Sequence, residues 1–212
     1  AKDAEAAGAS GFMVLPPYVY SSDWREMRGH VSEVFRATGL PCMLYNNPIA
    51  YRTDFLPPQV AELAAEFPHM QAIKESSADL RRITWLRTLM SDEFKILIGV
   101  DDLIVEAVHT GAVGWIAGLV NAMPAESVRL FELARAGRDA EAFELYAWFL
   151  PLLRLDIGTK FVQMIKLAVE HAGWGSSRVR GPRFELEGEE RAAVMRVIEE
   201  GFASRPDLKA LA

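Results

Sequence analysis

The chain has 212 residues, of which 50% are apolar and 25% are charged, and its formal net charge is −6. This is the composition of an ordinary soluble globular protein with enough apolar residues for a sizeable core. Because the densest basic stretch is the pair Arg81-Arg82, the charge pattern excludes the basic patches that bind nucleic acid or anionic membranes.

The single cysteine, Cys42, excludes a disulfide framework within the chain and favours a reducing compartment. No apolar stretch of the sequence approaches the roughly 20 residues that span a bilayer. We therefore expect a cytoplasmic protein.

In chain order, five short apolar runs end in polar or turn residues, and each is followed by a segment with apolar residues at helical spacing. Such runs are typical of strands buried on both faces, and their alternation with helices predicts an α/β fold with a parallel sheet. The predicted strands are 12–15, 42–45, 70–73, 95–99 and 115–118, and the predicted helices are 23–38, 57–66, 79–90, 101–109 and 124–136.

Beyond residue 137 the strand pattern ends, and helical patterns follow at 138–153, 160–173 and 188–203. The element boundaries carry the residues that usually start and stop helices. Asp23 and Asp79 are predicted N-caps, Pro57, Pro58 and Pro124 start helices, and Gly39 and Gly137 end them.

Five strand-helix units fit two architectures. An open doubly wound sheet needs five or six strands, whereas a closed (β/α)₈ barrel needs eight. The first predicted strand is followed by Pro16-Pro17-Tyr18-Val19-Tyr20 instead of a glycine-rich phosphate loop, and the stretch 111–114 precedes a strand, which is typical of a turn. The pattern alone leaves both architectures open.

Lys74 ends the third predicted strand, in the run Gln71-Ala72-Ile73-Lys74-Glu75-Ser76. An ammonium group there would lose much of its hydration, and desolvation favours the neutral amine, which is the form that attacks a carbonyl. The alternative, which position alone favours, is a lysine that extends to solvent or pairs with Glu75.

Tyr45 ends the preceding strand, in Tyr45-Asn46-Asn47-Pro48. Because the carboxyl ends of parallel strands meet at one edge, we expect Tyr45 and Lys74 to open at the same edge. A phenol there could shuttle protons. It could equally cap the core with its hydroxyl on water, while the asparagines make a turn.

Two later strand ends also carry candidate residues. Asp101 and Asp102 follow the fourth strand, where their carboxylates could hold substrate hydroxyls or favourably begin the next helix. Gly118 closes the fifth strand and would let a ligand approach the backbone.

Other kinds of site find no support in the sequence. The four histidines have no ligand-like spacing to one another or to Cys42, so no metal site is predicted. Ser21-Ser22 and Ser76-Ser77 have no His or Asp partner that the sequence nominates, which leaves a hydrolytic triad unsupported.

Taken together and in this order, five segments resemble the dihydrodipicolinate synthase and N-acetylneuraminate lyase family of class I Schiff-base enzymes, which are TIM barrels. The matching segments are 11–18, 44–48, 73–77, 99–102 and 111–118. By this resemblance the predicted strands are about strands 4 to 8 of a TIM (β/α)₈ barrel. Residues 1–137 would form the C-terminal part of the barrel, with the N-terminal strands and the family's carboxylate-binding loop absent from the chain, and residues 138–212 a helical extension packed on it.

The resemblance implies that Lys74 forms the imine and that Tyr45 shuttles protons beside it. No metal or organic cofactor is implied, because the imine itself is the electrophile. The residues that would contact the substrate are Asn47, Gly99, Asp101, Asp102, Ile116 and Gly118, with Asp101 facing the variable part of the substrate.

The substrate class is less clearly indicated. Synthases of the family follow their Tyr-Asn-x-Pro turn with Gly-Arg-Thr, whereas here Arg52 stands two positions later than the usual arginine. The turn and the Gly99–Asp102 loop resemble more closely the branch of 1-pyrroline-4-hydroxy-2-carboxylate deaminase. We therefore expect a Schiff-base lyase or deaminase acting on a 2-oxo acid or cyclic imine. The alternatives are a pyruvate-dependent aldolase or synthase, such as 4-hydroxy-tetrahydrodipicolinate synthase, and a non-catalytic ligand-binding barrel.

Members of the family commonly assemble as dimers or tetramers. Trp148, Phe149, Leu152 and Leu153 on the C-terminal helices offer apolar surface for such a homodimer or homotetramer. The expected partners are the small-molecule substrate and further copies of the chain, with no nucleic acid and no membrane.

Overall fold

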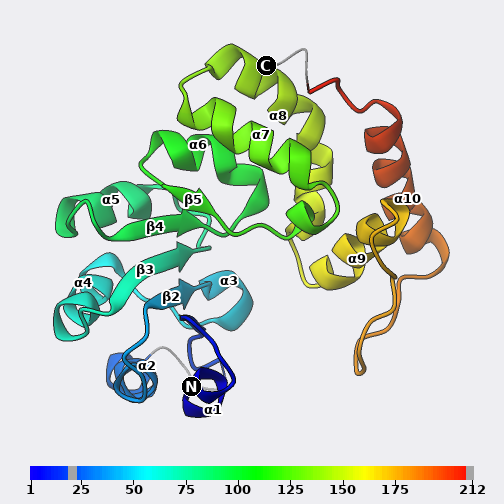
Figure 1. Cartoon of the computed structure of the whole chain (residues 1–212). Helices are drawn as coiled ribbons and strands as arrows, with labels where there is room; N and C mark the ends of the chain where they lie inside the picture. Colours follow the sequence, from blue (N-terminus) through cyan, green and yellow to red (C-terminus); the bar gives the residue numbers. More distant parts are fainter. Residues whose placement is uncertain (19–22, 209–212) are drawn as a thin grey trace. The chain divides into compact units, whose positions relative to one another are not determined.

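A computed structural model describes residues 1–18 and 23–208, so that Ser21 and Ser22 lie outside the described residues (Figure 1). The chain divides into two compact units. The first, which we call the sheet unit, comprises Ala1–Gly99 and Thr110–Gly114. The second, the helical unit, comprises Val100–His109 and Trp115–Ala212. The predicted boundary at residue 137 stays a prediction.

The strands form one sheet in sequence order, and the ladders from β1 to β4 are parallel. The register places Tyr45 opposite Lys74 and Asn46 opposite Glu75. This arrangement confirms the predicted α/β fold with a parallel sheet. The strands are β1 (Phe12–Val14), β2 (Cys42–Asn46), β3 (Met70–Glu75), β4 (Lys95–Ile98) and β5 (Gly114–Trp115).

Two helices of the sheet unit, α2 (Trp24–Arg36) and α4 (Pro57–Glu66), begin where the sequence predicts. The Asp23 side chain accepts a hydrogen bond from the backbone N–H of Glu26 (3.1 Å), which satisfies one free donor of the first turn. Pro57 begins its helix, where a missing N–H leaves nothing unpaired. These helices are α1 (Lys2–Ala6), α2 (Trp24–Arg36), α3 (Pro48–Tyr51), α4 (Pro57–Glu66) and α5 (Arg81–Leu89).

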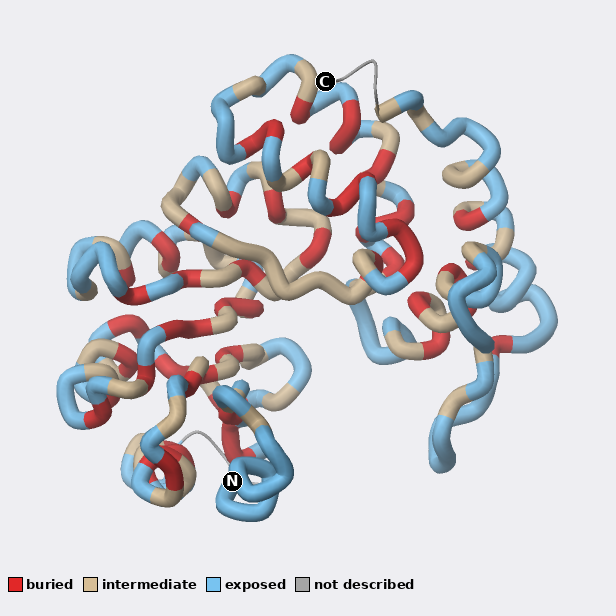
Figure 2. The backbone as a smooth tube through the Cα atoms, viewed as in Figure 1, coloured by how far each residue is buried: buried red, intermediate tan, exposed pale blue. Residues whose placement is uncertain are grey.

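Apolar side chains at helical and strand spacing form the core of the sheet unit. In Figure 2 buried positions recur along the strands and along the helices beside them. Each of these side chains removed from water stabilises the fold by about 1.5–3 kcal/mol. The fully buried ones include Met27, Val31 and Phe35 of α2, Val60 and Leu63 of α4, Ile83 and Leu86 of α5, and Leu44, Ile73 and Ile96 of the strands.

The helical unit contains the remaining helices. Pro124 begins one of them, and Gly137, with φ of +68°, follows its end in the left-handed conformation that glycine adopts readily. These elements are η1 (Asp101–Leu103), α6 (Ile104–His109), η2 (Leu119–Asn121), α7 (Pro124–Arg135), α8 (Asp139–Leu153), η3 (Arg154–Asp156), α9 (Phe161–His171) and α10 (Gly188–Ala203). Among the described residues, none of the helices has both the length and the apolar character needed to cross a membrane.

Four local predictions were wrong. The run after Tyr45 is not a plain turn, because Asn47 caps the short helix α3 by accepting from Ala50 N–H at 3.0 Å. The fifth strand ends at Trp115, before the predicted residues 116–118. Asp79 accepts a hydrogen bond from Arg81 N–H at 3.2 Å, but α5 begins after Leu80. Ala37, and not Gly39, is the C-cap of α2.

Strands β2 and β4 are buried mainly on one face, which corrects the expectation of two buried faces for them, whereas in β3 the neighbouring residues Ala72 and Ile73 are both buried. Along β2, Cys42, Leu44 and Asn46 are buried, whereas Met43 and Tyr45 between them are half-exposed. Successive strand residues point to opposite faces, so one face of β2 packs in the core and the other carries Tyr45.

The apolar residues expected at a subunit contact lie largely inside the helical unit. Phe149, Leu152 and Leu153 are fully buried within the chain. The Trp148 ring stacks on Phe149 with centroids 5.1 Å apart, and its N–H donates to Ser204 Oγ at 3.2 Å. The apolar surface of Phe149, Leu152 and Leu153 is therefore used in the core of the chain, whereas Trp148 is half-exposed, and the expected homo-oligomer stays a prediction.

Candidate functional site

Lys74 and Tyr45 come together on adjacent strands of the sheet unit. Lys74 is half-buried within β3, and the register pairs it with Tyr45 on β2. The Lys74 Nζ lies 4.4 Å from the centroid of the Tyr45 ring, a distance at which a cation is attracted by the ring face. The predicted nucleophile and the predicted proton shuttle are thus neighbours.

Asn47 orients the Tyr45 hydroxyl. Its Nδ2 donates a hydrogen bond of 3.0 Å to Tyr45 Oη, while its Oδ1 caps α3. Because this bond uses a lone pair of the phenol oxygen, the Tyr45 proton stays available to a group outside the pair. Asn47 therefore contacts the phenol directly, and its predicted contact with substrate stays a prediction.

Tyr51, which the sequence analysis missed, forms an aromatic wall with Tyr45 and Tyr18. The Tyr51 ring meets the Tyr45 ring edge-on, with centroids 5.7 Å apart, and lies 6.0 Å from the Tyr18 ring. Burial, followed by the charges of Tyr45 and Tyr18, raises the pKa of Tyr51 above its ordinary value, so its hydroxyl stays protonated. The helix α3, which was not predicted, places Tyr51 there.

Gly99 gives the Lys74 side chain its space. A Cβ atom at residue 99 would overlap Ser76 Oγ and Lys74 Cε and would lie 2.9 Å from Lys74 Cγ. The backbone N–H of Gly99 donates to the Glu75 carbonyl at 2.9 Å, which holds the end of β4 against β3. Lys74 therefore occupies part of the space that a side chain at residue 99 would need.

A second polar group lies at the same strand ends and was not predicted. Glu75 is buried and accepts hydrogen bonds from Asn46 Nδ2 at 3.0 Å and from Ser77 N–H at 2.6 Å. Burial raises the pKa of the Glu75 carboxyl, and the hydrogen bonds from Asn46 and Ser77 offset part of this effect.

Asp54 belongs to the same group through Asn46 and Arg82. Burial acts to raise the pKa of Asp54, but the hydrogen bonds and charge of Arg82, with a hydrogen bond from Asn46, outweigh it and hold this pKa below its ordinary value. The hydrogen bond from Arg82 Nη2 to Asp54 Oδ2 measures 2.8 Å.

Asp101 lies in the helical unit and organises a turn. It is fully buried, and its carboxylate accepts hydrogen bonds from Trp115 Nε1 at 3.2 Å, Gly118 N–H at 3.1 Å and Leu119 N–H at 2.8 Å. Asp101 therefore organises the turn after β5, and its predicted contact with the variable part of the substrate stays a prediction.

Gly118 is also explained within the helical unit. A Cβ atom at residue 118 would overlap the Asp156 carboxylate, so this glycine makes room for a side chain of the chain itself. Asp102 contacts Arg154, at 3.4 Å from Nε to Oδ2, and its carbonyl accepts from the Tyr146 hydroxyl. Ile116 is half-exposed. The predicted substrate contacts of Asp102, Ile116 and Gly118 stay predictions.

Arg52 is the C-cap of α3 and is exposed. Its φ of +58° lies in the left-handed region, which an arginine adopts only under constraint from its surroundings. Its position after α3 is therefore set by the backbone turn that closes this short helix.

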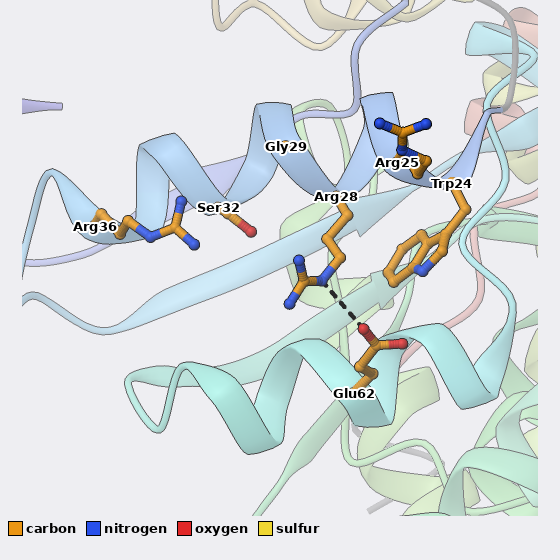
Figure 3. A pocket seen from close by; sticks show the side chains of 7 residues that line it. All are labelled: Trp24, Arg25, Arg28, Gly29, Ser32, Arg36 and Glu62. Atoms are coloured by element: carbon orange, nitrogen blue, oxygen red, sulfur yellow. Dashed lines mark ion pairs between the residues drawn. The ribbon is translucent and has the colours of Figure 1, made fainter.

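The sheet unit also has a cleft of about 340 Å³ between α2 and α4, away from Lys74 (Figure 3). Arg28 pairs with Glu62 and Glu66, and Arg36 pairs with Glu33 and Glu66. These carboxylates offset the charges of Arg28 and Arg36, so the cleft is less basic than its three arginines alone would make it. Its lining residues are Trp24, Arg25, Arg28, Gly29, Ser32, Arg36 and Glu62.

Among residues 1–18 and 23–208, no group of three or more His, Cys, Asp and Glu side chains is arranged so that it could hold a metal ion.

Known proteins resemble the chain in both sequence and structure. The model of the dihydrodipicolinate synthetase family matches residues 1–201. A protein of Methanopyrus kandleri named 4-hydroxy-tetrahydrodipicolinate synthase is 32% identical over 179 residues, which cover 84% of this chain and 60% of that protein. The chain thus spans about 60% of the length of this relative.

Two solved structures illustrate the structural likeness. The 4-hydroxy-tetrahydrodipicolinate synthase of Methylacidiphilum fumariolicum is 28% identical, with a TM-score of 0.88 over 95% of this chain and 67% of that one. YagE of Escherichia coli, a prophage protein of the dihydrodipicolinic acid synthase family solved in complex with pyruvate, is 26% identical, with a TM-score of 0.86 over 95% of this chain and 69% of that one.

The partial coverage of longer relatives agrees with a chain that holds part of a barrel, as the family resemblance implied. Together with the match to residues 1–201, these findings establish that the chain belongs to the dihydrodipicolinate synthetase family.

Proposed function

We propose that this chain carries the imine-forming centre of a class I Schiff-base enzyme that acts on a small 2-oxo acid. The observation that carries the proposal is the placement of Lys74 Nζ 4.4 Å from the Tyr45 ring, with the Tyr45 hydroxyl held by Asn47. A lysine amine beside an oriented phenol is the combination that imine formation needs, namely a nucleophile and a proton carrier.

In the proposed reaction, the neutral Lys74 amine attacks C2 of the oxo acid and forms a carbon-nitrogen bond. Tyr45 delivers a proton to the former carbonyl oxygen, which leaves as water, and a protonated imine remains. This imine withdraws electrons, so that C3 loses a proton to the Tyr45 phenolate. The resulting enamine carbon attacks an aldehyde to form a carbon-carbon bond, and Tyr45 returns the proton to the aldehyde oxygen, which becomes a hydroxyl. Water then hydrolyses the imine and releases the product from Lys74.

We favour pyruvate as the oxo acid and aldol-type condensation as the reaction. The similar proteins are named 4-hydroxy-tetrahydrodipicolinate synthase, and YagE was solved with pyruvate bound. These names support the hypothesis of a synthase or aldolase better than the hypothesis of a deaminase, which the sequence of the turn at residues 45–48 suggested. The wall of Tyr45, Tyr51 and Tyr18 would lie beside the part of the substrate beyond C3.

Deamination of a hydroxypyrroline carboxylate is the second candidate. It is favoured by the sequences of the turn 45–48 and of the Gly99–Asp102 loop, while Arg52, on the C-cap of α3, stands two positions after the usual arginine of the synthases. Consumption of pyruvate with an aldehyde would support the first candidate, and release of ammonia from the hydroxypyrroline would support the second.

Borohydride trapping tests the imine itself. The protein is reduced in the presence of pyruvate, and the reduced adduct is located by peptide mass spectrometry. We expect the adduct on Lys74, none in Lys74→Ala, and an unchanged yield in Lys95→Ala, which removes an exposed lysine of β4. Absence of any adduct in the unaltered protein with pyruvate or another 2-oxo acid would refute the proposal.

A further inference from the structure

Glu75 is a buried carboxylate next to the nucleophile, and the proposed chemistry gives it no task. Its exposed fraction is 2%, and the two strand residues that face each other at this level are Asn46 and Glu75. Because successive residues of a strand point to opposite faces, this pair lies on the face opposite to that of Tyr45 and Lys74. Tyr45 and Lys74 therefore share the backbone at the ends of β2 and β3 with the buried pair Asn46 and Glu75.

Asn46 fastens three parts of the sheet unit together. Its Nδ2 donates to Glu75 Oε2 at 3.0 Å and to the Phe55 carbonyl at 3.4 Å, and its Oδ1 accepts from Phe55 N–H at 3.0 Å. Its backbone carbonyl accepts from Ser76 N–H at 2.8 Å. The end of β2, the end of β3 and the far end of the loop that carries α3 are therefore joined at one amide.

Arg82 connects helix α5 to the same point. Its guanidinium donates two hydrogen bonds to the Asp54 carboxylate, and Asp54 Oδ1 accepts from Asn46 Nδ2 at 3.3 Å. The side chains of Arg82 and Asp54 are 17% and 29% exposed, so this pair is shielded from solvent more than a surface ion pair. We call Asn46, Asp54, Glu75 and Arg82 the strand-end clasp.

Stability alone is a poor explanation for the clasp. Burying a carboxylate such as Glu75 carries a desolvation penalty, and well-packed apolar residues often serve stability as well as a buried ion pair does. The clasp does supply a fixed geometry, because its hydrogen bonds are directional and come from β2, β3, the α3 loop and α5. Fixed geometry is what the Lys74 and Tyr45 pair requires.

We propose that the strand-end clasp is a positioning device that holds Lys74 Nζ against the Tyr45 ring through the backbone of β2 and β3. Its residues touch no substrate and act through Lys74 and Tyr45. This inference rests on the proposed imine chemistry, because the effect of the clasp is measured as the rate at which Lys74 forms the imine.

The test compares clasp variants with matched neighbours on α5. The rate of borohydride trapping is measured at increasing pyruvate concentrations for Asn46→Ala and Arg82→Gln. The controls are Arg81→Gln, which alters an exposed arginine paired with Asp79, and Ile83→Val, which loosens the core on the same helix. All variants are used at temperatures where circular dichroism shows them folded.

We expect the maximal trapping rate to fall at least about tenfold in Asn46→Ala and in Arg82→Gln, because displacement of a reacting group by about 1 Å can lower a rate by about 100-fold. The pyruvate concentration that gives half the maximal rate should change far less, since no clasp residue touches pyruvate. Both controls should keep the maximal rate of the unaltered protein.

Conservative replacement separates positioning from a general loss of structure. Glu75→Gln keeps an acceptor for the Asn46 amide but turns its NH2 group toward the Ser77 N–H, so it should retain more of the trapping rate than Glu75→Ala. Trapping at the unaltered rate in both Asn46→Ala and Arg82→Gln would overturn the inference, and so would an equal loss in Ile83→Val. If the unaltered protein forms no adduct on Lys74, the proposed function itself fails. If it forms the adduct and the clasp variants trap at the same rate, only the inference about the clasp fails.

Discussion

Replacement of Gly99 by alanine should disable the candidate site while leaving the sheet unit folded. The added Cβ would overlap Ser76 Oγ and Lys74 Cε, and the flexible lysine is the group that can move away. Overpacking of this kind costs about 1–3 kcal/mol of stability. A displacement of Lys74 Nζ by about 1 Å would slow its reaction by about 100-fold, which corresponds to about 2.7 kcal/mol in the barrier.

The assay is the rate of borohydride trapping with pyruvate, accompanied by urea unfolding. The matched control is Gly29→Ala in α2, where an added Cβ meets no atom within 4 Å. Because alanine is favoured over glycine in a helix by about 0.5–1 kcal/mol, Gly29→Ala should be slightly more stable and should trap normally. A Gly99→Ala protein that forms the Lys74 adduct at the unaltered rate would refute the assignment of this glycine.

Two further predictions concern stability. Arg82 holds the pKa of Asp54 below its ordinary value, so ionised Asp54 stabilises the fold at every pH above the ordinary Asp pKa. This contribution is lost as the pH falls through the lowered pKa of the folded state. The stability lost in Asp54→Asn, measured by urea unfolding, should therefore be constant above about pH 5 and shrink as the pH falls below about 4, the ordinary Asp pKa. A difference that stays constant over this acidic range would contradict the pairing. Asp101→Asn replaces an acceptor of three N–H groups and should cost roughly 1–3 kcal/mol, with faster hydrogen exchange at Gly118 and Leu119. Unchanged exchange at both amides would contradict this role of Asp101.

Most of the fold could be predicted from the sequence because it depends on local apolar spacing. The strands β1 to β4 and the helices α2, α4 and α7 to α10 lie within a few residues of their predicted ranges. The short helix α3 was missed because it has a single turn and its sequence, Pro48–Tyr51, follows two asparagines that favour turns equally well.

Some residues of the candidate site could likewise be predicted from the sequence, and others could not. Lys74 and Tyr45 could be predicted because both stand at strand ends, and a parallel sheet brings neighbouring strand ends together. The partners of Asn46 could not, since Phe55 and Glu75 are 9 and 29 residues away in the sequence. No spacing rule for helices or strands connects such positions, and an asparagine at a strand end looks the same whether it faces solvent or a buried carboxylate.

The closure of the α3 loop by the Asn46 amide has a consequence for how the substrate of this centre could change. Asn46 binds both the N–H and the carbonyl of Phe55, so residues 47–54 emerge from a base that is fixed independently of most of their side chains. The exposed positions Ile49 and Ala50 can therefore be replaced without moving this base. Under the proposed function, such replacements would alter the surface beside the substrate and leave the Lys74 amine in place.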